Sequence, residues 1–190
     1  TDANFNEAIE TCLSTNPIDG MCSDSEYGAM PYWDVSQVTN MYQAFFQKND
    51  FNADISSWDV SSVTTIGDMF KYAEEFNQNI GSWDVSSVTN MRGTFSGYEG
   101  VEVVFNQDIN NWDVSSVTDM SFMFCWNTSF NQDIGGWEVS SVTTMNDMFN
   151  LASTFNKDIG GWEVSNVTDM SYMFSNAYAF NKDIGGWDTS

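Results

Sequence analysis

The chain has 190 residues, which is room for one or two domains with a buried core. It carries 27 acidic and 5 basic side chains and no histidine, giving a formal net charge of −22. This balance argues against a nucleic-acid partner, and the lack of histidine excludes every mechanism that uses an imidazole. The 8 Trp, 7 Tyr and 15 Phe residues argue against disorder, because so many rings need a packed interior. No apolar run is long enough to predict a membrane span.

Residues 1–31 do not repeat, and we expect them to form an N-terminal cap. Phe5, Ile9 and Leu13 fall at helical spacing, after candidate helix caps at the start of the chain. This pattern predicts a helix that covers the first turn of whatever follows.

The cysteines favour an extracellular location. Cys12 and Cys22 flank a loop-like stretch, and we predict a disulfide between them that contributes roughly 2–3 kcal/mol. Cys125 is the odd cysteine, and neither a base nor a cation adjoins it in the sequence. We therefore expect it to be a small buried apolar group and not a reactive thiol.

Residues 32–190 consist of a repeat. One period reads F-N-x-D-I-x-x-W-D-V-S-x-V-T-x-M-x-x-M-F, followed by five variable residues. The I-x-x-W-x-V part has the spacing of a short strand, and the later Val, Met and Phe positions have the spacing of one or two helical turns. The tryptophans recur at intervals of 25, 25, 29, 25, 25 and 25 residues: Trp33, Trp58, Trp83, Trp112, Trp137, Trp162 and Trp187.

A unit this small cannot bury its own apolar face, so the copies must stack on one another. Stacking predicts one row of Phe rings and one row of Trp rings. It also predicts a ladder of Asn amides and a row of Thr side chains that form either a hydroxyl ladder or helix caps. The one longer interval comes from four extra residues within 96–104, which we expect to bulge out as a loop.

The motifs W-D-V-S-S-V-T-N-M and F-N-Q-D-I-G-G-W closely resemble the 25-residue repeat of BspA-like leucine-rich repeat surface proteins, over roughly residues 32–190. The resemblance implies an α/β fold, a leucine-rich-repeat-like right-handed solenoid with short parallel strands on its concave side, forming a single domain together with the cap of residues 1–31. It also implies a secreted or membrane-anchored protein with an adhesive or recognition role, and it brings no shared catalytic motif.

The repeat aligns acidic side chains in rows. One row comprises Asp34, Asp59, Asp84, Asp113, Glu138, Glu163 and Asp188. A second comprises Asp54, Asp108, Asp133, Asp158 and Asp183, and Asn79 interrupts it. Carboxylates about 4.8 Å apart repel by roughly 0.9 kcal/mol per pair even in water, so something must compensate.

Two explanations are open. Calcium ions could bridge the carboxylates of successive turns, with Asp108, Asp133, Asp158 and Asp183 as ligands. Alternatively, the rows form a solvated acidic face, held by neighbouring backbone N–H groups. We favour the second explanation, because no D-x-D-x-D-G calcium loop is present. We predict no catalytic residues, since a ladder repeats equivalent environments and acid–base catalysis needs two carboxyls whose pKa values are pushed apart.

Two N-glycosylation sequons occur, at Asn127 and Asn166. Asn166 occupies a repeat position that holds Ser or Gln in other copies, so we expect it to face solvent.

We therefore expect a non-catalytic extracellular or cell-surface protein that needs no cofactor, with Ca²⁺ as the one candidate ion. Its acidic face would contact a glycan, a cation or a surface protein. The alternative is a structural subunit of a filament. Apolar rows reach the last copy at Ile184 and Trp187, and the Phe5, Ile9 and Leu13 segment of a second molecule could cover them in a head-to-tail contact.

Overall fold

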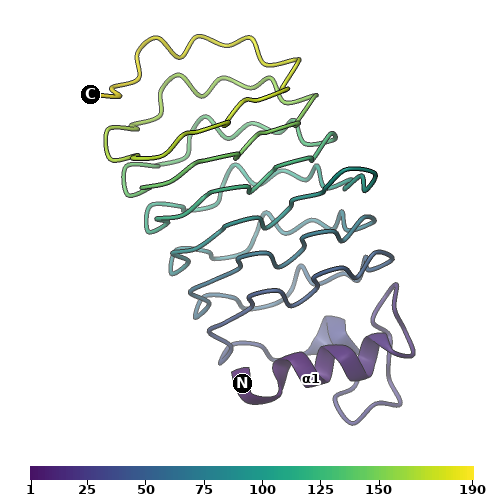
Figure 1. Ribbon diagram of the computed structural model, residues 1–190. Helices are drawn as coiled ribbons and strands as arrows, with labels where there is room; N and C mark the ends of the chain where they lie inside the picture. Colours follow the sequence, from purple (N-terminus) through teal and green to yellow (C-terminus); the bar gives the residue numbers. More distant parts are fainter.

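A computed structural model describes all 190 residues. The chain forms a stack of similar turns that rises from an N-terminal helix at one end to the C-terminus at the other (Figure 1). Regular structure is confined to the helix α1 (Asp2–Leu13) and the 3-10 helix η1 (Met30–Tyr32). Neither helix has the length and apolar character of a membrane span.

The predicted α/β class with parallel strands is wrong. Successive turns are joined in parallel only by isolated single-residue bridges, such as Asn40 to Thr65 and Thr65 to Asn90, and no strand or sheet forms. The segments expected as helical turns are likewise not helices. The molecule is a stack of irregular coils, and we use "coil" below for one 25-residue copy.

Tight turns replace the strand expected at I-x-x-W-x-V. In the second copy, the N–H of Trp58 donates to the carbonyl of Ile55 (3.1 Å) and the N–H of Val63 donates to the carbonyl of Val60 (2.8 Å). The side chain of Asp59 accepts the N–H of Ser61 (3.1 Å). In a strand, this N–H would instead donate to a carbonyl of the neighbouring strand. Asp-x-Ser and Asp-x-Gly spacings are typical of such turns, and this signal outweighed the strand pattern.

The second half of each coil is a chain of overlapping turns. Gln43 and Phe45 donate their N–H groups to carbonyls of the next coil (3.0 and 2.9 Å), whereas Ala44 donates to the carbonyl of Met41 in its own coil (3.2 Å). Gln43 has a φ of 58°, as required at the third residue of a type II turn. The hydrogen bonds therefore alternate between neighbouring coils and local turns, which fits neither a strand nor a helix.

The predicted aromatic rows are confirmed and form the core. Phe70, near the end of one coil, stacks on Phe76 at the start of the next with centroids 3.8 Å apart, and the equivalent rings Phe51 and Phe76 stack at 5.7 Å. The indole N–H of Trp83 donates to the carbonyl of Ile55 in the preceding coil (3.1 Å), and the later tryptophans repeat this bond. Each stacked pair contributes about 0.5–1.5 kcal/mol beyond the apolar area it buries.

The polar rows also connect coil to coil. The side-chain oxygen of Asn52 accepts the N–H of Asn77 (3.0 Å), and this amide ladder continues to Asn181. The N–H and the hydroxyl of Thr64 both donate to the carbonyl of Thr39 (2.8 and 3.1 Å). The Thr row is therefore a ladder and not a set of helix caps.

The residues of α1 close the N-terminal end of the stack. Its carboxylate at Asp2 accepts the N–H and the hydroxyl of Thr39 (both 2.7 Å), which replaces the carbonyl that a preceding coil would offer. Cys12 and Cys22 form the disulfide expected from the sequence, and Cys125 is buried and unpaired. The four extra residues protrude as a turn closed by a bridge between Tyr98 and Val101.

Candidate functional site

The carboxylates of the first acidic row accept hydrogen bonds from the backbone of their own coils. In Asp34, Asp59 and Asp113, one oxygen accepts both the N–H and the hydroxyl of the serine two positions later, at 2.6–3.1 Å. These serine hydroxyls, followed by the backbone N–H groups, lower the pKa of the three aspartates below the ordinary value. The row is thus a set of equivalent turn-forming carboxylates.

The candidate calcium ligands have a similar arrangement. Asp108, Asp133, Asp158 and Asp183 lie exposed along the stack, one on each coil, and each accepts the N–H two positions later at 2.9–3.0 Å. No group of three or more carboxylate or cysteine side chains converges as a metal ion would need.

The two sequons differ in accessibility. Asn127 is fully buried, its amide nitrogen donates to the carbonyl of Phe105 (3.1 Å), and its oxygen accepts two backbone N–H groups. A glycan on this amide nitrogen has no path to solvent and would displace its bond to Phe105, so glycosylation of folded Asn127 conflicts with the structure. Asn166 is exposed, and its amide donates only to the carbonyl of Ser140 (2.7 Å).

The assembly residues fall into two groups. The side chains of Phe5, Ile9 and Leu13 lie on the inner side of α1, where they are buried against the core of the same chain. They cannot cover another molecule while α1 stays in place, which corrects the head-to-tail contact expected from the sequence. Ile184 and Trp187 are partly buried and line the open face of the last coil.

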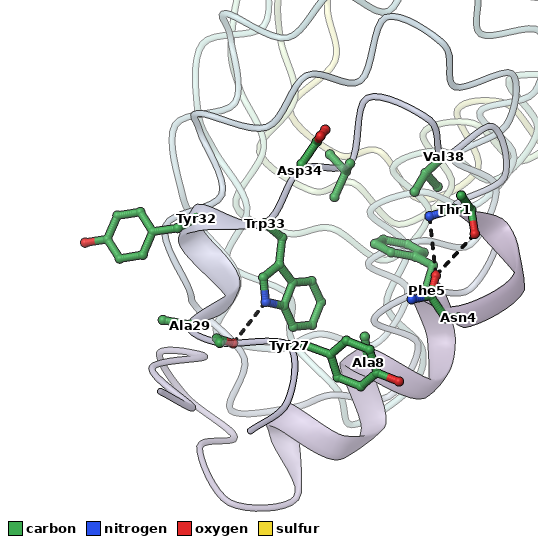
Figure 2. Close-up of a pocket in the computed structure, with 12 residues that line it drawn as sticks. Thr1, Asn4, Phe5, Ala8, Tyr27, Ala29, Tyr32, Trp33, Asp34 and Val38 are labelled. Atoms are coloured by element: carbon green, nitrogen blue, oxygen red, sulfur yellow. Dashed lines mark hydrogen bonds between the residues drawn. The ribbon is translucent and has the colours of Figure 1, made fainter. Parts of the chain in front are cut away.

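A cavity of about 300 Å³ opens between α1 and the first coil, and we call it the cap pocket (Figure 2). Its walls include the rings of Phe5 from α1, Tyr27 from the connecting loop and Trp33 from the first coil. Figure 2 shows these three side chains around one space, whereas Tyr32 points away from it. Ala8, Val35 and Val38 add small apolar side chains to the lining, and Thr1, Asn4 and Asp34 add polar ones.

The position of Trp33 in its row explains the cavity. Trp33 is nearly parallel to Trp58, at an angle of 11° and 6.3 Å between ring centroids. It is the first tryptophan of the row, so its other face has no tryptophan partner and borders the cap pocket. Its indole N–H donates to the carbonyl of Gly28 (3.0 Å), and this bond fixes the ring.

The pocket is acidic. Asp34 lines it, and no Lys or Arg side chain does. Desolvation, together with the carboxylates of Glu26 and Glu7, raises the pKa of Tyr27 above its ordinary value. Two further negative charges therefore lie close enough to Tyr27 to act on its hydroxyl.

The repeat pattern does not predict this site. It makes Trp33 one more member of a uniform row and assigns Tyr27 no role. The signal was available, because Trp33 is the first member of its row and no equivalent ring comes before it. The loop that carries Tyr27 could be placed beside it only by the folding of residues 14–29.

The fold defines a repeat protein of stacked 25-residue coils with a helical cap. In comparison with protein families, the chain matches twice the family described as Mycoplasma protein of unknown function, DUF285, over residues 19–102 and 96–190. The chain belongs to this family. The comparisons with curated proteins and with solved structures return no match.

Proposed function

We propose that this chain is a non-catalytic recognition module of a secreted or surface-exposed repeat protein of the BspA-like kind, and that it binds its partner at the cap pocket. The observation that carries the proposal is the pocket itself. It is a concave, aromatic-walled surface with a few polar groups at its edge, as is typical of binding sites. The remaining aromatic rows are filled by their own neighbours in the stack.

The acidic rows support binding over catalysis. Every member of the two rows except Glu163 accepts the N–H two positions later, so their environments are alike. Acid–base chemistry needs two groups whose surroundings differ. The disulfide between Cys12 and Cys22 supports an oxidising, extracellular location.

Retention of partners on immobilised protein tests this proposal. Beads that carry the wild-type chain, Trp33→Leu or Tyr178→Ala are exposed to a glycan array and to purified surface proteins. Tyr178 is an 80% exposed ring on the last coil, so Tyr178→Ala is the matched control for losing an aromatic side chain. We expect at least one ligand that wild type and Tyr178→Ala retain and Trp33→Leu loses. Equal retention by all three, or chemical conversion of a ligand, would contradict the proposal.

A second candidate function, a structural subunit, is favoured by the last coil. Met170, Phe174, Ile184 and Trp187 line an open apolar hollow of about 440 Å³ there.

Light scattering after size-exclusion chromatography tests the second candidate. We expect concentration-dependent oligomers that Trp187→Glu abolishes and Tyr178→Ala preserves. A monomer at all concentrations would rule out this route to self-assembly.

A further inference from the structure

We propose that the cap pocket binds an organic ammonium group, a positively charged nitrogen with apolar substituents. The inference rests on the proposed function, since it names the ligand class of the same site. It follows from three properties of the pocket: the ring faces, the acceptor oxygen that Asp34 leaves free, and the charge around it.

The rings come from three separate segments and enclose the space from different sides (Figure 2). Tyr27 and Trp33 meet at 67° with centroids 6.3 Å apart, so they form two walls of a corner. The face of an aromatic ring is electronegative and attracts a cation, most strongly for Trp. A corner of two rings closed by Phe5 suits an ammonium group, whose charge is spread over its apolar substituents.

The polar groups favour acceptors over donors. The indole N–H of Trp33 is already bonded to Gly28, so Trp33 offers its face and not its donor. Asp34 uses one oxygen to accept from Ser36, and its second oxygen has no hydrogen-bond partner in the structure. An ammonium group needs ring faces and acceptors, and the pocket presents both.

The charge around the pocket has the same sign as that of the whole molecule. Asp34, Glu7 and Glu26 lie at or near it, and the net charge is −22. The positive group at the rim is the amino group of Thr1, which donates to the side chain of Asn4 (3.3 Å). An anion would be repelled on approach, and a cation would be attracted.

Nuclear magnetic resonance titration of the full chain tests the inference. The probes are choline and its uncharged carbon isostere 3,3-dimethyl-1-butanol, which have the same shape and differ in charge. The indole N–H signal of Trp33, assigned from Trp33→Phe, reports on the pocket. We expect choline to shift this signal saturably and to bind about tenfold or more tightly than the isostere.

Matched variants separate the charge from the fold. Asp34→Asn removes a carboxylate of the pocket, and Asp59→Asn removes the equivalent carboxylate one coil away, which holds the same turn. We expect Asp34→Asn to weaken choline binding about threefold and Asp59→Asn to leave it unchanged. The dispersion of the remaining indole signals shows whether each variant is folded, so a folding defect is not mistaken for lost binding.

A further arm identifies the source of the ammonium group. Tighter binding of Nα-acetyl-lysinamide than of choline would support the inference and assign the group to a lysine side chain, and the reverse order would assign it to a choline-type headgroup. Equal binding of choline and its isostere, no binding of any of the three probes, or tighter binding of acetate would overturn the inference. Pocket-dependent retention of a partner together with any of these results would leave the proposed function standing.

Discussion

Single side chains shape every coil by accepting a backbone N–H two positions ahead. Asp59 shows the arrangement, because its carboxylate accepts from both the N–H and the hydroxyl of Ser61 (3.1 and 2.6 Å). These bonds stabilise the ionised carboxylate and lower its pKa. Their contribution to stability is present above the pKa of the unfolded chain, at about pH 4, and is lost as the pH falls through the lowered pKa of the folded chain.

We predict that Ser61→Ala raises the pKa of Asp59 towards its ordinary value, because the hydroxyl is the largest cause of the lowering. Titration of the carboxyl carbon signals by nuclear magnetic resonance measures this shift. Ser62→Ala is the control, since the neighbouring Ser62 is exposed and holds no carboxylate. A similar pKa of Asp59 in both variants would show that the hydroxyl bond is absent in solution.

Gly93 leaves room for a buried side chain of the preceding coil. Its φ is +61°, and a Cβ atom there would overlap the carboxylate of buried Asp68, which is paired with Lys71 at 3.2 Å. We predict that Gly93→Ala lowers the free energy of unfolding by about 2–3 kcal/mol. Urea denaturation measures the loss. Gly161→Ala should be nearly neutral, because no atom lies within 4 Å of its added Cβ; equal losses would mean that the overlap is relieved at little cost.

At the scale of elements, the overlapping turns carry an unusual backbone. Ten residues other than glycine have positive φ, including Gln43 and Gln47 in the first coil and Asp147 and Leu151 in the fifth. A left-handed conformation costs about 1–2 kcal/mol for such residues. The stack tolerates this cost in the first five coils, because each such residue there also donates its N–H to a carbonyl of the next coil.

We predict that Gln43→Gly stabilises the chain by about 0.5–1 kcal/mol, since glycine adopts a φ of 58° without strain. Gln37→Gly is the matched control. Gln37 is also an exposed glutamine at the third position of a turn, the turn from Val35 to Val38, and its φ is not positive. There glycine should destabilise by about 0.5–1 kcal/mol. Urea midpoints that shift in the same direction would contradict the argument.

The contact between α1 and the first coil depends on Asp2. Its carboxylate accepts two bonds from Thr39, and these bonds lower its pKa. We predict that Asp2→Ala costs about 1 kcal/mol, limited by the exposure of the pair to water. It should also speed hydrogen exchange at the Thr39 amide. Asn6→Ala, on the exposed side of α1, should change neither quantity. Unchanged exchange at Thr39 in Asp2→Ala would contradict this role.

At the scale of the whole molecule, stacking gives the inner coils the same environment. One core of 50 buried residues runs from α1 to the last coils. The same stacking aligns the carboxylates, so the charge of −22 is distributed in rows along the molecule. Repulsion within these rows should make the stability depend on dissolved cations.

We predict that NaCl and millimolar CaCl₂ raise the melting temperature equally at equal ionic strength, because each carboxylate of the Asp108 to Asp183 row already binds its own backbone. Differential scanning calorimetry measures the shift. A larger effect of CaCl₂, absent in Asp133→Asn, would instead support calcium bridging along this row.

The sequence by itself determined the repeat, the stacked rows and the cap. The Phe and Trp rows follow from the period, because like side chains must meet when identical units stack. The period also fixed the Asn ladder, and the position of Cys12 and Cys22 indicated their bond. These features depend on spacing along the chain, which a sequence records directly.

Only the tertiary structure decided the backbone conformation and the site. The apolar pattern of Ile55, Trp58 and Val60 suits a strand, but Asp59 and Ser61 fold the same residues into turns, and the competition between them depends on bonds to neighbouring coils. The cap pocket likewise exists because Tyr27 and α1 lie beside the face of Trp33 that has no tryptophan partner. Contacts between segments without a common period leave no pattern in the sequence, since packing and not spacing brings them together.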